Sequence, residues 1–305
     1  MPRRANGRRI LGLVVLCAAI GLPACSGSDA PATGTTRPSG LADIDPCVLV
    51  TRADAHAVVG AGPAARRGRR IQDVFCSYSM ENGYLGVLVA TKRFSRDEFE
   101  AAAKAGGAAP VPGLGDSAFW RDRTTSLYVL KGSLVLRVDL FTNKPAAALR
   151  KAAAALADDA LGRISAEQVG TVLTDTSDER PASVNACALV RRGVVRGLVG
   201  MPEKAERFTE VGYVGCHWSG ANGFVQASLL TKAYSRAEFA AGAGGGRALD
   251  GLGDHAFTRS EEGLADVAVL KGSTVFTVRV AVAGASKSAL LEAARSLAAQ
   301  AVGRI

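Results

Sequence analysis

The chain repeats itself once, and this duplication limits its fold more than any other feature. The segment TKRFSRDEFEAAA, residues 91–103, returns as TKAYSRAEFAAGA at residues 231–243, a shift of 140 residues. The motif GLGD at residue 113 returns at residue 251, a shift of 138. Solenoid repeats are roughly 20 to 50 residues long. A period of this length therefore predicts two copies of a whole domain.

The N-terminus has the order of charged and apolar residues that is typical of a secretory signal peptide. Four arginines, at positions 3, 4, 8 and 9, precede an apolar stretch over residues 10–22. This stretch is shorter than the roughly 20 residues that a membrane-spanning helix needs. The tetrapeptide LPAC, which ends at Cys25, resembles the lipobox of bacterial lipoproteins. That resemblance implies cleavage before Cys25, a diacylglyceryl group on its thiol, and a location at the outer face of the cell membrane. The alternative is an ordinary secreted protein with an unmodified cysteine.

The duplication and the signal peptide together divide the chain into five parts. The polar stretch between the repeats reads SAEQVGTVLTDTSDERPAS and has few residues suited to a core. We expect a lipoprotein signal peptide at 1–24, a lipidated cysteine and flexible tether at 25–41, a first repeat domain at 42–164, a linker at 165–183 and a second repeat domain at 184–305.

The charge of the exported chain argues against nucleic acid as a partner. The whole sequence has 37 basic and 28 acidic residues, and removal of the signal peptide leaves 33 basic residues and a net charge of +5. A nucleic-acid binder is expected to carry a pronounced basic stripe with aromatic residues between the charges. This excess is mild, and export also separates the protein from nucleic acid.

Each repeat carries the same local signals. Asn82-Gly83 and Asn222-Gly223 suit the positive φ values of a type I′ turn and predict a hairpin in each repeat. Ser95 and Glu98 have the spacing of a capping box, which predicts the start of a helix. Ser235 and Glu238 repeat this signal.

The second half of each repeat predicts two more strands and a long helix. Residues 126–131 and 133–141 are expected to pair, and the second strand alternates leucine and valine with Arg137 and Asp139. One face of that strand should be buried and the other wet. An alanine-rich helix is expected at 146–161. The fold class that follows is α+β, with two homologous domains, each an antiparallel sheet covered by helices with one internal disulfide.

Four cysteines remain after Cys17 leaves with the signal peptide and Cys25 takes lipid. Export permits disulfides, and four cysteines allow three pairings. The duplication favours pairing within each repeat, because a unit that was once independent must have closed its own bridge. We therefore expect Cys47–Cys76 and Cys187–Cys216, each with a spacing of 29 residues. Metal binding is the weaker alternative, since the chain has no short-spaced cysteine pair and no histidine that both repeats share.

Several motifs occur twice in the order of a known family. The stretch DPCVLVTRADAHAVVG at residues 45–60 is followed by CSY in the first repeat, where the second has CHW, and then by GLGDSAF and GLGDHAF. In this order the motifs resemble actinobacterial cell-envelope lipoproteins built on a domain of unknown function. The second repeat has Ala186 where the first has Pro46. The resemblance implies a cell-envelope location and supplies no catalytic residues.

Residues that could carry catalysis do not form a repeated set. The chain has three histidines, His56, His217 and His255, and none is duplicated. Asp116 and Asp254 are repeated, but one carboxylate in each domain makes no acid/base pair, so we expect them to cap turns. The GLGD loops fit a turn into a strand better than a dinucleotide site, which needs a strand before it and a helix after it. The sequence predicts no catalytic residue, no metal and no cofactor.

Two classes of function are therefore compatible with the sequence. The first is a non-catalytic, lipid-anchored module that binds an envelope protein, a polymer or a small apolar ligand. The second is an envelope enzyme with a site between the two repeats. A deep pocket in which several titratable groups converge would favour the enzyme, and a shallow apolar groove would favour binding.

One short segment distinguishes the two repeats by charge. AARRGRR at residues 64–70 contains four arginines, whereas the matching MPEKAER at residues 201–207 contains two glutamates. The tether keeps the first repeat near the membrane, where each basic residue contributes about 1 kcal/mol at an anionic surface. We expect this surface contact at Arg66, Arg67, Arg69 and Arg70. The alternative is a solvated loop whose charge has no role.

Overall fold

The computed structural model describes residues 41–60, 64–80, 83–170, 185–201, 204–261 and 263–305. The predicted signal peptide and Cys25 lie outside these residues, as does most of the predicted linker. Within the described ranges, no helix combines the length and the apolar character that a membrane crossing requires.

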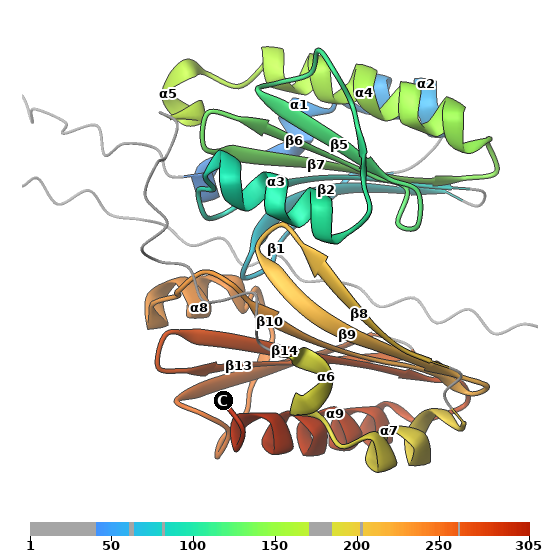
Figure 1. Ribbon diagram of the computed structural model, residues 1–305, viewed down its shortest axis with the longest axis vertical. Helices are drawn as coiled ribbons and strands as arrows, with labels where there is room; N and C mark the ends of the chain where they lie inside the picture. Colours follow the sequence, from blue (N-terminus) through green and yellow to red (C-terminus); the bar gives the residue numbers. More distant parts are fainter. Residues whose placement is uncertain (1–40, 61–63, 81–82, 171–184, 202–203, 262) are drawn as a thin grey trace, which may run out of the picture. The chain divides into compact units, whose positions relative to one another are not determined.

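The first repeat folds as an antiparallel sheet of seven strands, in the order β1-β2-β3-β7-β6-β5-β4 (Figure 1). The predicted strands at 126–131 and 133–141 are present as β6 and β7, and β7 begins one residue later than expected. The strands are β1 (Arg66–Arg69), β2 (Asp73–Met80), β3 (Gly83–Ala90), β4 (Ala109–Pro110), β5 (Ser117–Arg121), β6 (Ser126–Lys131) and β7 (Leu134–Thr142).

The second repeat forms a seven-stranded sheet in the order β8-β9-β10-β14-β13-β12-β11. Strand for strand, this is the order of the first sheet. The predicted fold class, two similar α+β units built on antiparallel sheets, is confirmed. The strands are β8 (Lys204–Glu210), β9 (Tyr213–Gly220), β10 (Gly223–Leu230), β11 (Arg247–Ala248), β12 (His255–Glu261), β13 (Leu264–Lys271) and β14 (Thr274–Val282).

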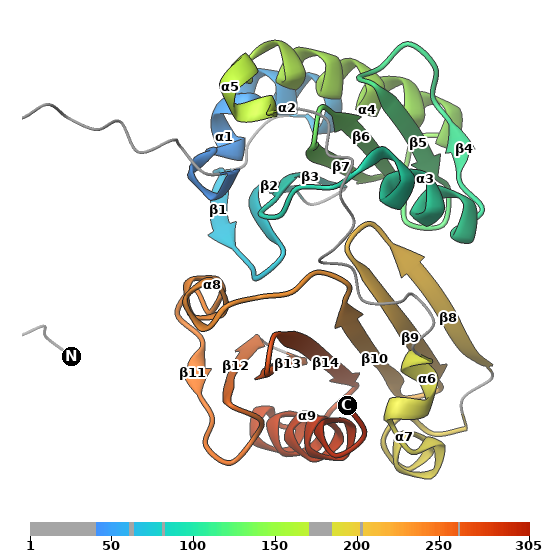
Figure 2. The same ribbon diagram turned by 60° about the vertical axis from the view of Figure 1, so that its left-hand side comes forward.

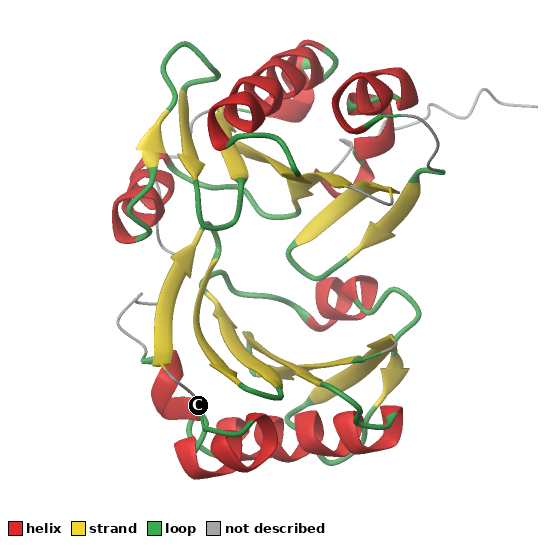
Figure 3. Ribbon diagram, turned by 90° about the vertical axis from the view of Figure 1, so that its right-hand side faces the viewer, coloured by secondary structure: helices red, strands yellow, loops and turns green. Residues whose placement is uncertain are grey.

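A long helix covers one face of each sheet (Figures 2 and 3). Helix α4 packs on β6 and β7, and α9 packs on β13 and β14. The predicted capping boxes are confirmed at the starts of α3 and α8. The helices are η1 (Leu41–Asp43), α1 (Pro46–Leu49), α2 (Arg52–Val59), α3 (Arg96–Ala105), α4 (Ala146–Gly162), α5 (Ala166–Val169), α6 (Ala186–Leu189), α7 (Arg192–Val199), α8 (Arg236–Gly242) and α9 (Lys287–Val302).

The start of the predicted linker is folded onto the first repeat. Ser165 and Gln168 form a capping box that begins the short helix α5. Val169 packs against the first core, and its carbonyl accepts a hydrogen bond of 3.0 Å from Arg93. These contacts tie the residues that follow α4 to the first domain.

Each repeat contains its own disulfide, as the duplication predicts. Cys47 lies in α1 and bonds Cys76 in β2, and Cys187 in α6 bonds Cys216 in β9. The residue before each short helix caps it in the same way, because Asp45 and Asn185 both accept a hydrogen bond from the cysteine amide two residues later. The asparagine cap accounts for the matching geometry of the second repeat, although Ala186 replaces the proline.

The hairpin predicted from Asn222-Gly223 forms, but its turn is one residue earlier than expected. Gly220 pairs with Gly223, which leaves Ala221 and Asn222 as the loop. Among the described residues other than glycine, only Thr125 has a positive φ, so this loop is not the predicted type I′ turn. Gly223 has a φ of 151°, and a Cβ there would lie 2.0 Å from the carbonyl oxygen of residue 281. Glycine is therefore required by the close approach of β14.

The prediction that one face of strand β7 is exposed to solvent is wrong. Leu136 and Val138 enter the core under α4, as the alternation predicts. On the opposite face Asp139 is only 7% exposed and Val135 is also buried. Arg137, on that same face, lines a pocket that residues of the second repeat complete. Val135 is covered by aromatic residues of its own repeat, whereas Arg137 faces the pocket that the second repeat completes.

Candidate functional site

A pocket of about 620 Å³ is lined by strands of both sheets. This volume lies within the usual range for small-molecule sites. The lining is rich in arginine, with Arg70, Arg121 and Arg137 from the first repeat and Arg259 and Arg279 from the second. It is therefore a polar, charged pocket and not the apolar groove that was the other expectation.

The second sheet contributes a continuous row of polar side chains to this pocket. The strand register places the five residues side by side on β9, β10, β14, β13 and β12, and all five line the pocket. In that order they are His217, Gln226, Arg279, Asp266 and Arg259. Within the row, Arg279 and Asp266 form an ion pair of 2.7 Å.

The first sheet has a matching row of different composition. Its members, at the positions equivalent by the duplication, are Ser77, Gly86, Asp139, Ser126 and Arg121. Only the last position is the same residue in both repeats. Of this row only Arg121 lines the pocket, so the two sheets share a backbone framework but present different side chains to the pocket.

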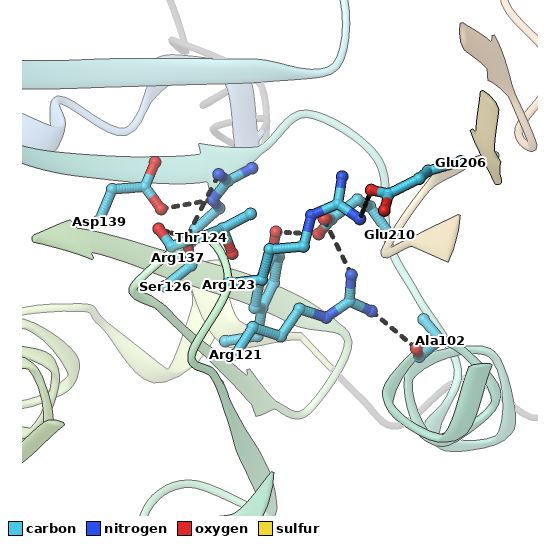
Figure 4. Close-up of polar contacts among 10 residues, drawn as sticks. Ala102, Arg121, Arg123, Thr124, Ser126, Arg137, Asp139, Glu206 and Glu210 are labelled. Atoms are coloured by element: carbon cyan, nitrogen blue, oxygen red, sulfur yellow. Dashed lines mark hydrogen bonds and ion pairs between the residues drawn. The ribbon is translucent and has the colours of Figure 1, made fainter. Parts of the chain in front are cut away.

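One end of the pocket is closed by a buried ion pair between the repeats (Figure 4). Arg121 lies 2.8 Å from Glu210 and donates a second hydrogen bond of 2.7 Å to the carbonyl of Ala102 on α3. The hydroxyl of Tyr128 donates to the other oxygen of Glu210. Burial raises the pKa of Tyr128 well above its usual value, so the phenol stays protonated. Glu210 is thus satisfied by two donors of the first repeat.

A second charged pair lies next to this end. Arg137 donates a hydrogen bond of 2.6 Å to Asp139 (Figure 4). Burial lowers the pKa of Arg137, but Asp139, Tyr128, Tyr213 and Glu210 together outweigh it and raise the pKa well above the usual value. The nearby Tyr213 has its pKa raised to about 12, chiefly by burial. At neutral pH this region therefore holds a charged guanidinium and a neutral phenol.

The other end of the pocket has guanidinium groups without a carboxylate partner. Arg259 hydrogen-bonds to backbone carbonyls of residues 69, 242 and 243. Arg70 lies over the ring of Phe75, with its Cζ 4.8 Å from the ring centroid. Among the described residues, neither arginine forms an ion pair with an acid. Burial and the charge of Arg70 lower the pKa of Arg259.

Asp73 is a buried acid at this end with an unsatisfied oxygen. Its residue is 8% exposed, and its Oδ1 atom has no hydrogen-bond partner among the described residues. Burial raises its pKa, although Arg70, Arg137 and Arg259 act in the opposite direction. An unpaired buried polar atom costs about 1–3 kcal/mol. Because Asp73 lines the pocket, a ligand could supply the missing partner.

The contact between the repeats is reciprocal. Lys92 forms an ion pair of 2.5 Å with Glu238, and the equivalent Lys232 pairs with Glu98. The turns that follow β1 and β8 each pack against the other repeat in the same reciprocal way. Ile71 belongs to a hydrophobic cluster of the second repeat, and Val211 packs against one of the first. The two copies thus meet through equivalent surfaces, like the halves of a symmetric dimer.

The four arginines that the charge pattern singled out do not share one environment. Arg66 and Arg67 are exposed and form surface ion pairs with Glu261 and Asp45. Arg69 and Arg70 are half-buried, and the second of these lines the pocket. Only the first two therefore lie fully at the surface.

The repeated carboxylates cap turns, as expected. Asp116 accepts a hydrogen bond of 2.5 Å from the amide of Gly132, and Asp254 accepts one of 2.6 Å from Gly272. Neither aspartate lines the pocket. His217 does line it, and burial and the charge of Arg123 lower its pKa. Within the described part of the chain, no group of three or more metal-binding side chains is placed to hold a metal ion.

Comparison with known proteins does not assign the chain to a family. No family model matches the chain, and no curated protein matches it. A solved structure of the Helicobacter pylori beta clamp bound to a DNA ligase peptide aligns with 79% of the chain at 9% identity and a TM-score of 0.15. The chain covers 65% of the length of that protein. A TM-score this low indicates neither a shared fold nor a shared function.

Sequence reasoning missed most of the pocket. Arg121, Glu210 and Asp73 carry no motif and lie far apart in the sequence. One signal was available, because residue 121 is arginine and its equivalent, residue 259, is arginine too. A repeated charge in a segment that otherwise reads as a buried strand indicates a structural role in both copies.

Proposed function

We propose that this protein is a lipid-anchored module of the cell envelope that binds a small ligand, without catalysis, between its two repeats. The observation that carries the proposal is the pocket of about 620 Å³, which neither repeat forms alone. The tandem arrangement then has a reason, since two copies are needed to enclose one site. The polar, arginine-rich lining favours a polar ligand over the apolar one expected from sequence.

The converging titratable groups also favour the second candidate, an envelope enzyme with its site between the repeats. Two features argue for binding instead. Glu210 and Asp266 are engaged in ion pairs with arginines, which removes them as bases. No hydroxyl or thiol of the described residues hydrogen-bonds to His217, so no activated nucleophile is assembled there.

Pocket occupancy can be tested on protein purified from its native membrane. Native mass spectrometry should reveal a bound small molecule in the wild type, and Thr277→Trp, which fills the pocket, should lack it. Ala289→Trp adds the same side chain on exposed α9 and should retain the ligand. Absence of a ligand from all three proteins would contradict the proposal. Chemical conversion of the released ligand on incubation with fresh protein would favour the enzyme.

The anchor is tested by Cys25→Ala. This variant should leave the membrane fraction and lose the mass of a diacylglyceryl group, because the lipobox resemblance assigns the lipid to that thiol. A variant that still partitions with membranes as the wild type does would overturn the anchor and leave ligand binding unaffected.

A further inference from the structure

The reciprocal contact between the repeats relates the two ends of the pocket. Arg121 and Arg259 are equivalent residues, and so are Glu210 and Arg70. Both equivalent arginines also donate to equivalent helix carbonyls, at Ala102 and at Gly242. The backbone framework is therefore the same at both ends, but the first end has Glu210 and Tyr128 where the other end has Arg70 and Ala268.

The presence of Arg70 at the position equivalent to Glu210 replaces a carboxylate by a guanidinium. At the first end, the turn of the second repeat places Glu210 against Arg121. At the other end, the turn of the first repeat brings Arg70 toward Arg259, whose Nη2 donates to the carbonyl of the neighbouring residue 69 at 3.3 Å. Two positive groups thus converge where the symmetry of the fold would place an ion pair. Like charges at a partly buried site are unfavourable unless an anion lies between them.

Asp73 does not supply that anion. It forms no ion pair with either arginine among the described residues, and its buried Oδ1 has no partner. Burial raises the pKa of this carboxyl and so favours its neutral form.

We infer that an oxyanion of the ligand binds between Arg70 and Arg259. It takes the position that the carboxylate of Glu210 occupies beside Arg121 at the opposite end of the pocket. The body of the ligand then lies along Asp266 and Arg279, which follow Arg259 in the row on the second sheet and offer hydrogen-bonding groups. The ligand class is a small carboxylate or phosphate with a polar body. This inference rests on the proposed function, since it assigns the chemistry of the same pocket.

The test restores the missing carboxylate. Arg70→Glu should form the ion pair with Arg259 that Glu210 forms with Arg121, and should therefore exclude an external anion. Inorganic phosphate and citrate serve as probes, because they separate a phosphate from a carboxylate preference, with sodium chloride at equal ionic strength as the reference. Calorimetric titration should show binding to the wild type that is weaker by at least about tenfold in Arg70→Glu.

Two further variants make the result decisive. Arg52→Glu makes the same charge change on exposed α2, outside the pocket, and should bind as the wild type does. Arg70→Gln removes the charge without adding a carboxylate and should also weaken binding, which covers the case in which Arg70→Glu does not fold.

Three outcomes with the phosphate and citrate probes would overturn the inference. They are equal binding by the wild type and both Arg70 variants, an equal loss in Arg52→Glu, and no binding of either probe to the wild type. The proposed function fails separately, through the absence of any ligand in the native protein. If a native ligand bound Arg70→Gln as tightly as the wild type, the proposal of a ligand-binding pocket would stand, but the anion site at Arg70 would be refuted.

Discussion

Arg121 and Glu210 form an ion pair of 2.8 Å between the repeats, although the two side chains are only 6% and 7% exposed. Tyr128 and the carbonyl of Ala102 add hydrogen bonds to this pair, whereas the buried Nε of Arg121 has no partner among the described residues. A buried pair gives limited net stability, but removal of one partner leaves a buried charge without compensation.

The first prediction follows from this pair. Glu210→Gln should reduce the free energy of unfolding by about 3–5 kcal/mol, because it leaves the charge of Arg121 buried. Glu261→Gln, which breaks the exposed pair with Arg66, should cost less than about 1 kcal/mol. Denaturant unfolding of both variants measures the difference. Equal effects would show that the interface pair has no special weight.

Asp73 predicts a pH dependence of stability. Burial raises its pKa in the folded protein above the usual value of 3.8, and the charged groups that also influence it are Arg70, Arg137, Asp139 and Arg259. The unfolded chain therefore releases the proton first as pH rises. The contribution of Asp73 to stability is therefore largest below the pKa of the unfolded chain, and it is lost as pH rises to the raised pKa of the folded state.

Asp73→Asn should remove this dependence. Relative to the wild type, the variant should gain stability as pH rises above about 4, since asparagine does not ionise. The measurement is denaturant unfolding of both proteins from pH 3 to pH 8, without added phosphate or carboxylate. A constant difference between the two proteins across that range would contradict the assignment.

The disulfides should contribute similar stability to the two repeats. Replacement of Cys47 and Cys76 by serine should cost about 3–4 kcal/mol, and replacement of Cys187 and Cys216 should cost the same, because both loops span 29 residues. Denaturant unfolding of the two double variants checks the magnitude. Peptide mapping without reductant checks the pairing, and a peptide that joins Cys47 to Cys187 would refute it.

The predicted contact with an anionic surface would involve Arg66 and Arg67, because these two of the four arginines lie fully at the surface. With the anchor removed by Cys25→Ala, the protein should bind anionic vesicles at low salt, and serine at both positions should weaken that binding because each arginine contributes about 1 kcal/mol. Serine at Arg191 and Arg192 makes the same change in the second repeat and should have little effect. Equal binding by all three proteins would leave the arginines without this role.

The sequence alone determined the features that depend on local spacing or on the duplication. The capping box of Ser95 and Glu98 formed as expected, because its partners are three residues apart and need no distant contact. The disulfide of Cys47 and Cys76 followed from the requirement that each copy close its own bridge. The sheets followed from alternation within single strands.

Only the tertiary structure decided whether the polar face of each sheet is exposed to solvent or lies against the other repeat. Arg137 and Asp139 alternate with core residues in a way that indicates solvent, yet Asp139 is buried and Arg137 lines a pocket that the second repeat completes. His217 and Arg259 belong to one row because four strand pairings add up across the sheet, and no local pattern contains that register. Arg121 meets Glu210 because the repeats pack through equivalent surfaces. Long-range register and domain packing place these groups together, so their chemistry could not be read from the order of residues.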